Sequence, residues 1–338
     1  MMQKAIKQWC ATIANSMPRK GFPLMTYVSL ALTGMNVLDV VQDGKKQALC
    51  LQALADKFPA CAGFVTIMDL SVEAEAFGAK VRYEQNETPT VIGQLIDHRQ
   101  AAASLRVPGI GQGRTGVYLE ALALASKGMT DKPLFGCVIG PFSLAGRLCD
   151  INQIFMKLIE EPDMVHTVLE KCTYFLIAYA KAFKDAGANG IFIAEPAAGL
   201  ISPRQCQEFS SNYVKQIVAS VQDENFMVVL HNCGNTRKLV PVMLDTGARG
   251  YHFGNAVDMN DILPQIPSDT LAFGNIDPSS IFRNGTPGEV KARTLALLEK
   301  VSGYHNFVPS SGCDIPPGTP VRNLEAFFAA LEEYQKKG

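Results

Sequence analysis

The feature that most constrains the fold of this chain is a repeated alternation of short apolar runs with longer amphipathic stretches. Buried strands that alternate with helices indicate βα units and a parallel sheet. We therefore interpret the apolar runs as strands and the stretches between most of them as helices. The predicted strands cover residues 22–28, 62–68, 133–139, 190–194, 227–230, 250–253, 271–273 and 307–309.

Two of the helical stretches have recognisable ends. The clearest begins with Glu161-Pro162-Asp163, carries apolar residues at helical spacing and stops at Gly187. Another begins with Ser202 as N-cap and Pro203 at the first helical position.

The number of predicted strands favours a closed barrel over an open doubly wound sheet. Eight strands follow one another without a break in composition, which is typical of a (β/α)8 TIM barrel. The chain has 338 residues, 47% of them hydrophobic, and such a length suits either one large domain or two ordinary ones. We expect a single barrel domain over residues 1–338, with an N-terminal helical extension.

A glycine-rich segment raises the possibility of dinucleotide binding. Residues 109–116 read GIGQGRTG, but no strand leads directly into them and the glycine spacing is wrong for that fingerprint. We interpret the segment as a loop or an active-site lid. Arg114 in this segment, with Arg106 and Lys127, belongs to the long connection between the second and third predicted strands, part of which could cover the site.

Composition excludes several classes of partner. The formal net charge is −1, from 31 basic and 32 acidic residues, which gives no reason to expect nucleic acid or an anionic membrane. No apolar run approaches the length of a membrane helix. The nine cysteines are scattered, and most, such as Cys50, Cys137 and Cys172, have apolar neighbours. Buried, reduced thiols of this kind predict a cytoplasmic protein.

The strand at residues 227–230 ends in His231, Asn232 and Cys233. Residues two apart on an extended strand point to the same side, so the imidazole and the thiol are expected to share one face. In a barrel this strand end lies where catalytic residues gather. The pair could still be an unrelated polar residue and a core residue.

A third soft ligand follows the last predicted strand. Cys313 lies in the turn-rich segment SSGCDIPPGTP, too far from Cys233 for a zinc finger but suited to two converging loops. His231, Cys233 and Cys313 together predict a catalytic zinc site with one open position. Two thiolates and a neutral imidazole leave Zn²⁺ without net charge, which suits activation of a thiol for alkyl transfer.

Several motifs resemble those of one known family. The markers GPFSLAGRL from Gly140, FGNIDP from Phe273, HNCGN from His231 and SSGCDIPPGTP from Ser310 are similar to those of the uroporphyrinogen decarboxylase superfamily, and within it to zinc-dependent methylcobamide:coenzyme M methyltransferases. The similarity extends over nearly the whole chain, with further markers at SVEAEAFGAKV and GANGIFIAEPAAGLISP.

This resemblance implies a specific reaction. It implies that His231, Cys233 and Cys313 bind zinc, that a coenzyme M-like thiol takes the open position, and that the methyl group comes from methylcobalamin, the methylated corrinoid of a partner protein. It disfavours porphyrinogen decarboxylation, because decarboxylases carry an arginine-rich loop after the first strand and this chain has no arginine in residues 25–36.

One strand departs from the family pattern. Gly254 and Asn255 stand where many zinc members have a carboxylate near the metal, and His252 lies just before them. Either the open position takes only solvent or substrate, or His252 replaces the carboxylate; alternatively His252 points into the packing.

Other polar residues lie at predicted strand ends and are candidates for substrate binding. Glu195 and Asp277 could position substrate, or could cap a helix or brace a loop. Asp69 could face the barrel mouth, whereas Glu73 and Glu75 could simply open a helix. The tentative substrate-binding set is therefore Asp69, Glu195, His252, Asn255 and Asp277.

Three classes of function remain open. The first is methyl transfer from a corrinoid protein to a thiol. The second is the same zinc chemistry with another donor or acceptor, as in a demethylation pathway. The third is a non-catalytic barrel that binds corrinoid or metal for delivery. Demethylation of free methylcobalamin that depends on thiol separates the first two classes from the third.

Overall fold

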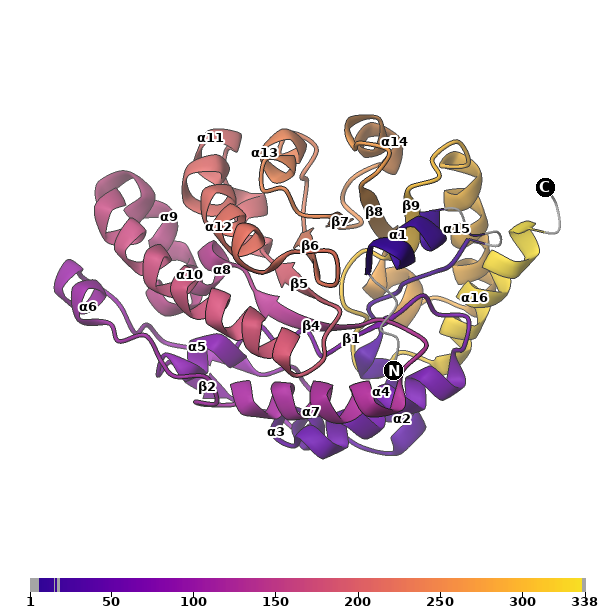
Figure 1. Cartoon of the computed structure of the whole chain (residues 1–338), viewed down its shortest axis with the longest axis horizontal. Helices are drawn as coiled ribbons and strands as arrows, with labels where there is room; N and C mark the ends of the chain where they lie inside the picture. The colour runs from indigo at the N-terminus through magenta and orange to yellow at the C-terminus, as the bar shows by residue number, and fades with distance from the viewer. Residues whose placement is uncertain (1–5, 15, 17–18, 336–338) are drawn as a thin grey trace.

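The computed structural model describes residues 6–14, 16 and 19–335. Its centre is a parallel sheet of seven strands in the order β1-β4-β5-β6-β7-β8-β9 (Figure 1). Almost every residue of these strands is buried, as expected for a parallel sheet covered on both faces. The strands are β1 (Phe64–Val65), β4 (Leu134–Ile139), β5 (Gly190–Ala194), β6 (Met227–Asn232), β7 (Gly250–Phe253), β8 (Leu271–Ile276) and β9 (Phe307–Ser311).

An extended segment at Phe22 closes the sheet into a barrel. The amide of Phe22 donates to Pro309 O of β9 at 2.8 Å, and the amide of Ala62, before β1, donates to Gly21 O at 2.9 Å. The segment therefore occupies the eighth position, and the predicted (β/α)8 barrel class is confirmed.

The predicted strand over residues 22–28 is nevertheless wrong in its second half. Residues Thr26–Val28 form a 3₁₀ turn, η1, and a helix follows at once. Pro23 and Pro309 lie in the two segments that meet at the seam, and neither carries a backbone N–H, so the backbone pairing there is interrupted. The Leu24 amide instead donates to the Ser311 hydroxyl at 3.0 Å.

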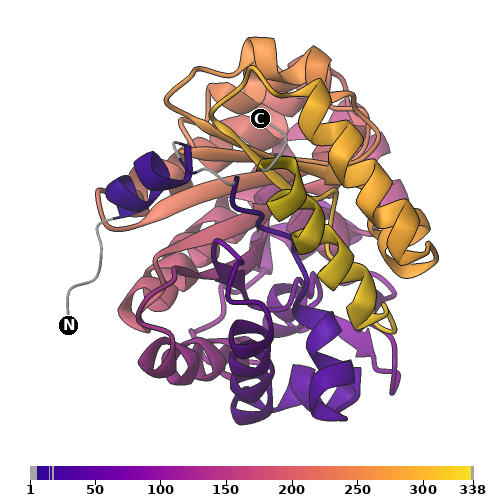
Figure 2. The same ribbon diagram turned by 90° about the vertical axis from the view of Figure 1, so that its right-hand side faces the viewer.

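Helices surround the sheet, and the two patterns recognised in the sequence are both present. Residues 161–187 contain α10, and the pattern that begins at Ser202 contains α11, a π-helical turn (η3, Gln207–Ser211) and α12. The C-terminal helices α15 and α16 lie side by side (Figure 2). No helix among the described residues is long and apolar enough to cross a membrane. The helices are α1 (Ile6–Ala14), α2 (Ser29–Thr33), α3 (Val37–Gln42), α4 (Gly44–Lys57), α5 (Val72–Ala76), α6 (Arg99–Ser104), α7 (Thr115–Gly128), α8 (Pro141–Cys149), α9 (Ile151–Glu160), α10 (Pro162–Asp185), α11 (Pro203–Cys206), α12 (Asn212–Val221), α13 (Val240–Leu244), α14 (Met259–Ile262), α15 (Pro287–Lys300) and α16 (Val321–Gln335).

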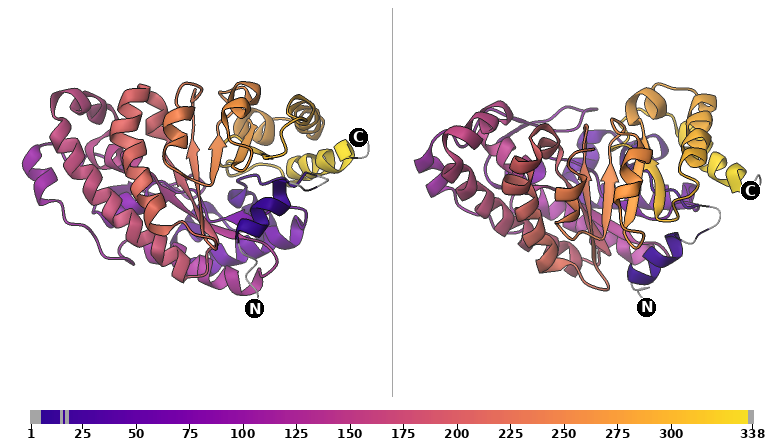
Figure 3. Two further views of the ribbon diagram at one scale, coloured as in Figure 1. Left: turned by 45° about the horizontal axis from the view of Figure 1, so that its top comes forward. Right: turned by 90° about the horizontal axis from the view of Figure 1, so that it is seen from above.

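The predicted N-terminal helical extension, α1, covers one end of the barrel. Its buried residues Ile6, Trp9 and Ile13 join the apolar cluster that fills the barrel interior. The Trp9 indole N–H donates to Ala62 O, just before β1, at 3.1 Å. Helix α1 thus lies at the amino ends of the strands (Figure 3), and chemistry is left to the carboxyl ends.

The connection between β1 and β4 is the longest between neighbouring strands. It holds α5, a two-stranded antiparallel sheet of β2 (Lys80–Arg82) and β3 (Thr90–Ile92), α6 and α7. The glycine-rich residues 109–114 form the loop that leads into α7, with positive φ at Gly111 and Gly113. The prediction of a loop here is confirmed.

Candidate metal centre at the carboxyl ends of the strands

Strand β6 delivers two soft ligand atoms to the barrel mouth. His231 is 1% exposed, and its Nε2 lies 2.9 Å from the Cys233 Sγ, just beyond the end of the strand. The alternation of side chains along an extended strand places both on one side of the chain.

Cys313 reaches the same point from the loop after β9. Its Sγ lies 3.6 Å from the Cys233 Sγ and 3.5 Å from His231 Nε2. All three ligand atoms lie within 4.8 Å of one another. The structure therefore brings together the three residues that the sequence singled out, although β7 and β8 lie between their strands.

The spacing of these atoms fits a zinc ion. With Zn–S distances of about 2.3 Å and Zn–N distances of about 2.0 Å, a tetrahedral site places two sulfurs ~3.8 Å apart and a sulfur and a nitrogen ~3.5 Å apart. The observed separations of 3.6 and 3.5 Å match, whereas the 2.9 Å separation is shorter than a shared ion would give. Two thiols and an imidazole are also the ligand types that zinc prefers.

The two thiols have unequal acidity. Their mutual hydrogen bond lowers the pKa of Cys233, against the opposing effect of burial. The same hydrogen bond, together with burial, raises the pKa of Cys313 to about 12. One thiolate therefore forms more easily than two, and a bound cation would favour loss of both protons.

His252 lies beside the site, with both ring nitrogens engaged by the protein. Its Nδ1 is 2.7 Å from His231 Nδ1, and its Nε2 is 3.0 Å from the Ser310 hydroxyl. The side chain is completely buried, which lowers its pKa well below the ordinary value, and the nearby His231 lowers it further. The geometry thus favours a supporting position over direct contact with metal or substrate.

Asn255 and Asp277 meet each other across the ends of β7 and β8. Asn255 Nδ2 donates to Asp277 Oδ2 at 2.9 Å. The other Asp277 oxygen accepts from the amides of Ser279 and Ser280 at 2.8 Å each and so caps the turn η5 (Pro278–Arg283). Both residues line a cavity of about 610 Å³ whose charged lining also includes Asp258, Arg293 and Lys300.

Glu195 follows β5 and caps a helix. Its carboxylate accepts from the amides of Phe142 and Ser143 at 2.8 Å each, at the start of α8, and from the Ser210 hydroxyl at 2.9 Å. The carboxylate thereby satisfies N–H groups that the first helical turn leaves free. Burial raises the pKa of Glu195, and these hydrogen bonds partly offset that effect.

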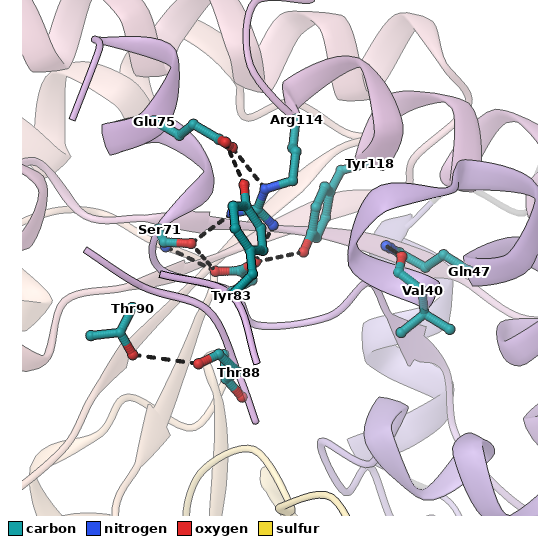
Figure 4. A network of polar contacts seen from close by, with 10 residues as sticks. Val40, Gln47, Ser71, Glu75, Tyr83, Thr88, Thr90, Arg114 and Tyr118 are labelled. Carbon is teal, nitrogen blue, oxygen red and sulfur yellow. Dashed lines mark hydrogen bonds and ion pairs between the residues drawn. The ribbon is translucent and has the colours of Figure 1, made fainter. Parts of the chain in front are cut away.

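Asp69 is the centre of a buried polar network that ties down the glycine-rich loop. It forms an ion pair with Arg114, and it also accepts hydrogen bonds from the Ser71 hydroxyl at 2.6 Å and the Tyr118 hydroxyl at 3.0 Å. Arg114 also donates to Glu75 at 2.7 Å, as Figure 4 shows. These partners occupy both Asp69 oxygens, which supports an anchoring role for the carboxylate.

The Arg114 side chain is held on several sides. Its guanidinium lies 5.0 Å from the centre of the Tyr83 ring and donates to the Ser71 hydroxyl at 2.7 Å. Burial is the largest single effect and lowers the pKa of Arg114, but the charge and hydrogen bond of Asp69 together with the effects of Tyr118 and Glu75 outweigh it, and the net pKa is raised. The loop that carries Arg114 is therefore fastened to the end of β1.

Four polar residues were not proposed from the sequence as part of the site, although Glu73 was noted as a possible helix start. Ser310 contacts His252, and its place in the SSGCD motif was an available signal. Asp314 follows Cys313, and burial raises its pKa well above the ordinary value. Glu73 does begin α5 as predicted, yet it is 1% exposed, and burial raises its pKa to about 8.

Arg147 is the fourth of these residues. It is the one basic residue of α8, it is partly buried, and the described residues offer its guanidinium no hydrogen bond or ion pair. Burial lowers its pKa, and the charge of Asp69 acts in the opposite direction. A lone cation in a mostly apolar helix after a barrel strand was the signal available in the sequence.

Comparison with known proteins shows several relatives. The chain is 31% identical over 271 residues to a methylcobamide:CoM methyltransferase MtbA of Methanosarcina acetivorans, covering 79% of this chain and 78% of that protein. It is 29% identical over 273 residues to a methylcobamide:CoM methyltransferase MtaA of Methanosarcina barkeri, covering 78% of each. A uroporphyrinogen decarboxylase of Hydrogenovibrio crunogenus is 25% identical over 284 residues, which cover 81% of this chain and 79% of that one.

A solved structure shares the fold. A methyltransferase from Methanosarcina mazei superposes with a TM-score of 0.86 at 24% identity, over 98% of this chain and 99% of that one. The family model for uroporphyrinogen decarboxylase (URO-D) matches residues 14–334. With nearly the whole chain matched, this protein belongs to the uroporphyrinogen decarboxylase family.

Proposed function

We propose that this protein is a zinc-dependent methyltransferase that moves a methyl group from the methylated corrinoid of a partner protein to a small thiol. The observation that carries the proposal is the meeting of His231, Cys233 and Cys313 at the carboxyl ends of the strands. Methylcobamide:CoM methyltransferases among the relatives support the reaction class and a coenzyme M-like acceptor.

The residues have distinct roles in this proposal. His231, Cys233 and Cys313 would hold the zinc, which when bound lowers the pKa of a coordinated thiol and keeps the sulfur as a thiolate. Three protein ligands leave one position for the acceptor sulfur. Helix α1 and the packed interior close the opposite end of the barrel, so the acceptor and the methyl donor would both approach through the mouth.

We propose that Arg147 binds the end of the thiol acceptor that lies opposite its sulfur. Its guanidinium has no hydrogen-bond or ion-pair partner among the described residues, and a partly buried cation without a partner favours an anionic group. An acidic thiol such as coenzyme M, which carries a sulfonate, would satisfy it. Asp69, Glu195, Asn255 and Asp277 support the surrounding loops in this proposal.

The decarboxylase alternative receives less support. The segment after Phe22, where the resemblance implies substrate-binding arginines, has none in residues 25–36. We also propose that residues 1–338 form one domain. The nine cysteines are free, which supports a reducing compartment such as the cytoplasm.

The test is transfer from free methylcobalamin. Purified protein is incubated with methylcobalamin and a panel of thiols, with and without an acidic group, and loss of the methyl–cobalt absorbance is followed. We expect demethylation that requires both zinc and thiol and is fastest with acidic thiols. A protein that binds zinc but never demethylates methylcobalamin would instead favour metal or corrinoid delivery.

Arg147→Ala and Arg147→Lys refine the test. We expect Arg147→Ala to raise the KM for an acidic thiol with little change for a neutral thiol of similar size, and Arg147→Lys to recover part of the loss. Equal changes in KM for the two thiols would show that Arg147 does not recognise the acidic group of the acceptor.

A further inference from the structure

A buried chain of hydrogen bonds runs from the candidate metal centre to the seam of the barrel. His231 Nδ1 lies 2.7 Å from His252 Nδ1, and His252 Nε2 lies 3.0 Å from the Ser310 Oγ. The Ser310 hydroxyl in turn donates to the carbonyl of Phe22 at 2.6 Å. His231, His252 and Ser310 are each at most 1% exposed, so the protein supplies the partners within this chain.

The direction of each hydrogen bond in this chain can be derived from the Phe22 carbonyl, at the end farthest from the candidate metal centre. A backbone carbonyl only accepts, so the single Ser310 proton points to Phe22 O. The Ser310 Oγ is then the acceptor for His252, which must carry its proton on Nε2. A neutral imidazole has one N–H, so His252 Nδ1 has a lone pair, and it can bond His231 Nδ1 only by accepting from it.

Two further observations agree with this assignment. The carbonyl of His252 also lies 3.3 Å from His231 Nδ1 and demands a proton on that nitrogen. The ring of His252 is 0% exposed, and such complete burial favours the uncharged imidazole.

We propose that His252 and Ser310 are positioning residues that hold His231 in the tautomer protonated on Nδ1. The lone pair of His231 then lies on Nε2, the nitrogen that faces the sulfurs of Cys233 and Cys313. The tautomer is a property of the metal-free protein, and only its effect on zinc binding rests on the proposed function.

The chemical nature of the group that accepts the hydrogen bond from His231 Nδ1 matters for this site. Metal-binding histidines usually donate their second N–H to a carboxylate, a backbone carbonyl or water, which orients the ring. Here the strong acceptor is a neutral imidazole from the neighbouring strand, paired in register with His231. A carboxylate would add a negative charge beside two thiolates, whereas His252 orients the ring without adding one.

The tautomers can be read directly by nuclear magnetic resonance. The chain has five histidines, so two-bond ¹H–¹⁵N correlation spectra of metal-free, histidine-labelled protein are simple enough to assign. We expect His231 to be protonated on Nδ1 and His252 on Nε2. Zinc affinity is measured in parallel by competition with a chelator.

Two substitutions of His252 separate hydrogen bonding from packing. His252→Phe keeps an aromatic ring beside Phe192 and Phe273 but removes both nitrogens. We expect it to let His231 populate the Nε2–H form and to weaken zinc binding about 10- to 100-fold. His252→Asn restores an acceptor oxygen near the former Nδ1, and we expect it to recover the Nδ1–H form and part of the affinity.

Ser310 has a matched control in the next residue. Ser310→Ala removes the oxygen that accepts the Nε2 proton of His252. His252 can then carry its proton on Nδ1, where it faces His231 Nδ1 and disfavours a proton on that nitrogen. Ser311→Ala also removes a fully buried hydroxyl, one that accepts from the Leu24 amide outside the chain of hydrogen bonds. We expect Ser310→Ala to shift the His231 tautomer and Ser311→Ala to leave it unchanged.

The outcomes are distinguishable. A wild-type His231 protonated on Nε2, or a His252→Phe variant with unchanged tautomer and unchanged zinc affinity, would overturn the positioning role. If the wild-type protein shows the expected tautomers and they respond to these substitutions, but it binds no zinc, the positioning role stands and the proposed function fails.

Discussion

The sulfur atoms of Cys233 and Cys313 lie 3.6 Å apart although 80 residues separate them in the chain. Parallel strands that end at the same rim of a barrel bring such distant residues together. We expect zinc at one equivalent per chain in the wild-type protein and much less in Cys313→Ala, because two ligands hold zinc far less tightly than three. Elemental analysis of the purified proteins measures this.

The control for that prediction is another cysteine of the barrel interior. Cys137 is buried within the barrel and is not one of the three grouped ligand residues. Cys137→Ala should keep a full equivalent of zinc. Full zinc occupancy in Cys313→Ala would show that Cys313 is not a zinc ligand.

Removal of the metal should leave the fold intact. The apolar interior and the seven-stranded sheet rest on side-chain packing and strand pairing and not on metal ligation, unlike a zinc finger, whose folding requires the metal. We expect chelator-treated protein to keep its circular dichroism spectrum and to lose methyl transfer. Loss of both signals together would contradict a purely catalytic zinc.

Binding of the thiol should release a proton. A free alkyl thiol has a pKa of roughly 8.5 and is mostly protonated near neutral pH, whereas a zinc-bound sulfur is a thiolate. Binding should therefore release about one proton per thiol and tighten as the pH rises towards the free thiol's pKa. Calorimetry in two buffers of different ionisation enthalpy counts the protons. Affinity that is independent of pH, with no proton released, would rule out binding as a zinc thiolate.

Breaking the Arg114–Asp69 ion pair should destabilise the protein strongly. The Asp69 side chain is 0% exposed and that of Arg114 is 7% exposed, so Arg114→Met leaves a buried carboxylate without its cation. We expect a loss of about 3–5 kcal/mol in the free energy of unfolding, measured with denaturant.

The double variant and a surface pair provide the controls. Asp69→Asn combined with Arg114→Met removes both charges and should cost less than the sum of the single changes. Arg99→Met at the Arg99–Glu161 pair, where the Arg99 side chain is 64% exposed, should cost about 1 kcal/mol or less. Equal losses for Arg114→Met and Arg99→Met would show that the buried network contributes little.

Glu73 should make stability fall as the pH rises. Burial raises its pKa from 4.5 to about 8, so the folded state binds the proton more tightly than the unfolded state does. Its contribution is fully present below the unfolded pKa and is lost as the pH approaches the folded pKa, with an upper bound of about 5 kcal/mol.

Glu73→Gln, which keeps the shape of the protonated acid, should remove that dependence between pH 5 and 8. Denaturation of both proteins across this range gives the comparison. Parallel stability curves would show that Glu73 ionises as readily in the folded chain as in the unfolded one.

The sequence predicted the parts of the site that depend on local pattern. His231 and Cys233 share a strand end, and Cys313 follows another, so strand periodicity and barrel topology were sufficient to bring them together. The roles of Glu195 and Asp277 stayed open because a carboxylate before a helix suits either a cap or a substrate contact.

Other features depend on pairings that one strand cannot reveal. The contact of His252 with His231 requires the register between β6 and β7, and that with Ser310 requires the curvature that brings in β9. The first strand was predicted too long because the apolar run 22–28 looks continuous, whereas Pro23 lacks a backbone N–H and the chain turns into η1 at Thr26.

The seam at Phe22 has a thermodynamic consequence for the whole molecule. One atom, the Ser310 Oγ, bonds both the carbonyl of Phe22, in the segment that closes the barrel, and the imidazole of His252 that supports His231. Closure of the barrel at Phe22 and protonation of His231 on Nδ1, the form that can bind a metal, are therefore coupled equilibria. A metal ion or ligand that stabilises His231 in this form should slow local opening at Phe22. Amide hydrogen exchange at Phe22, in the barrel wall, would then report binding at the barrel mouth.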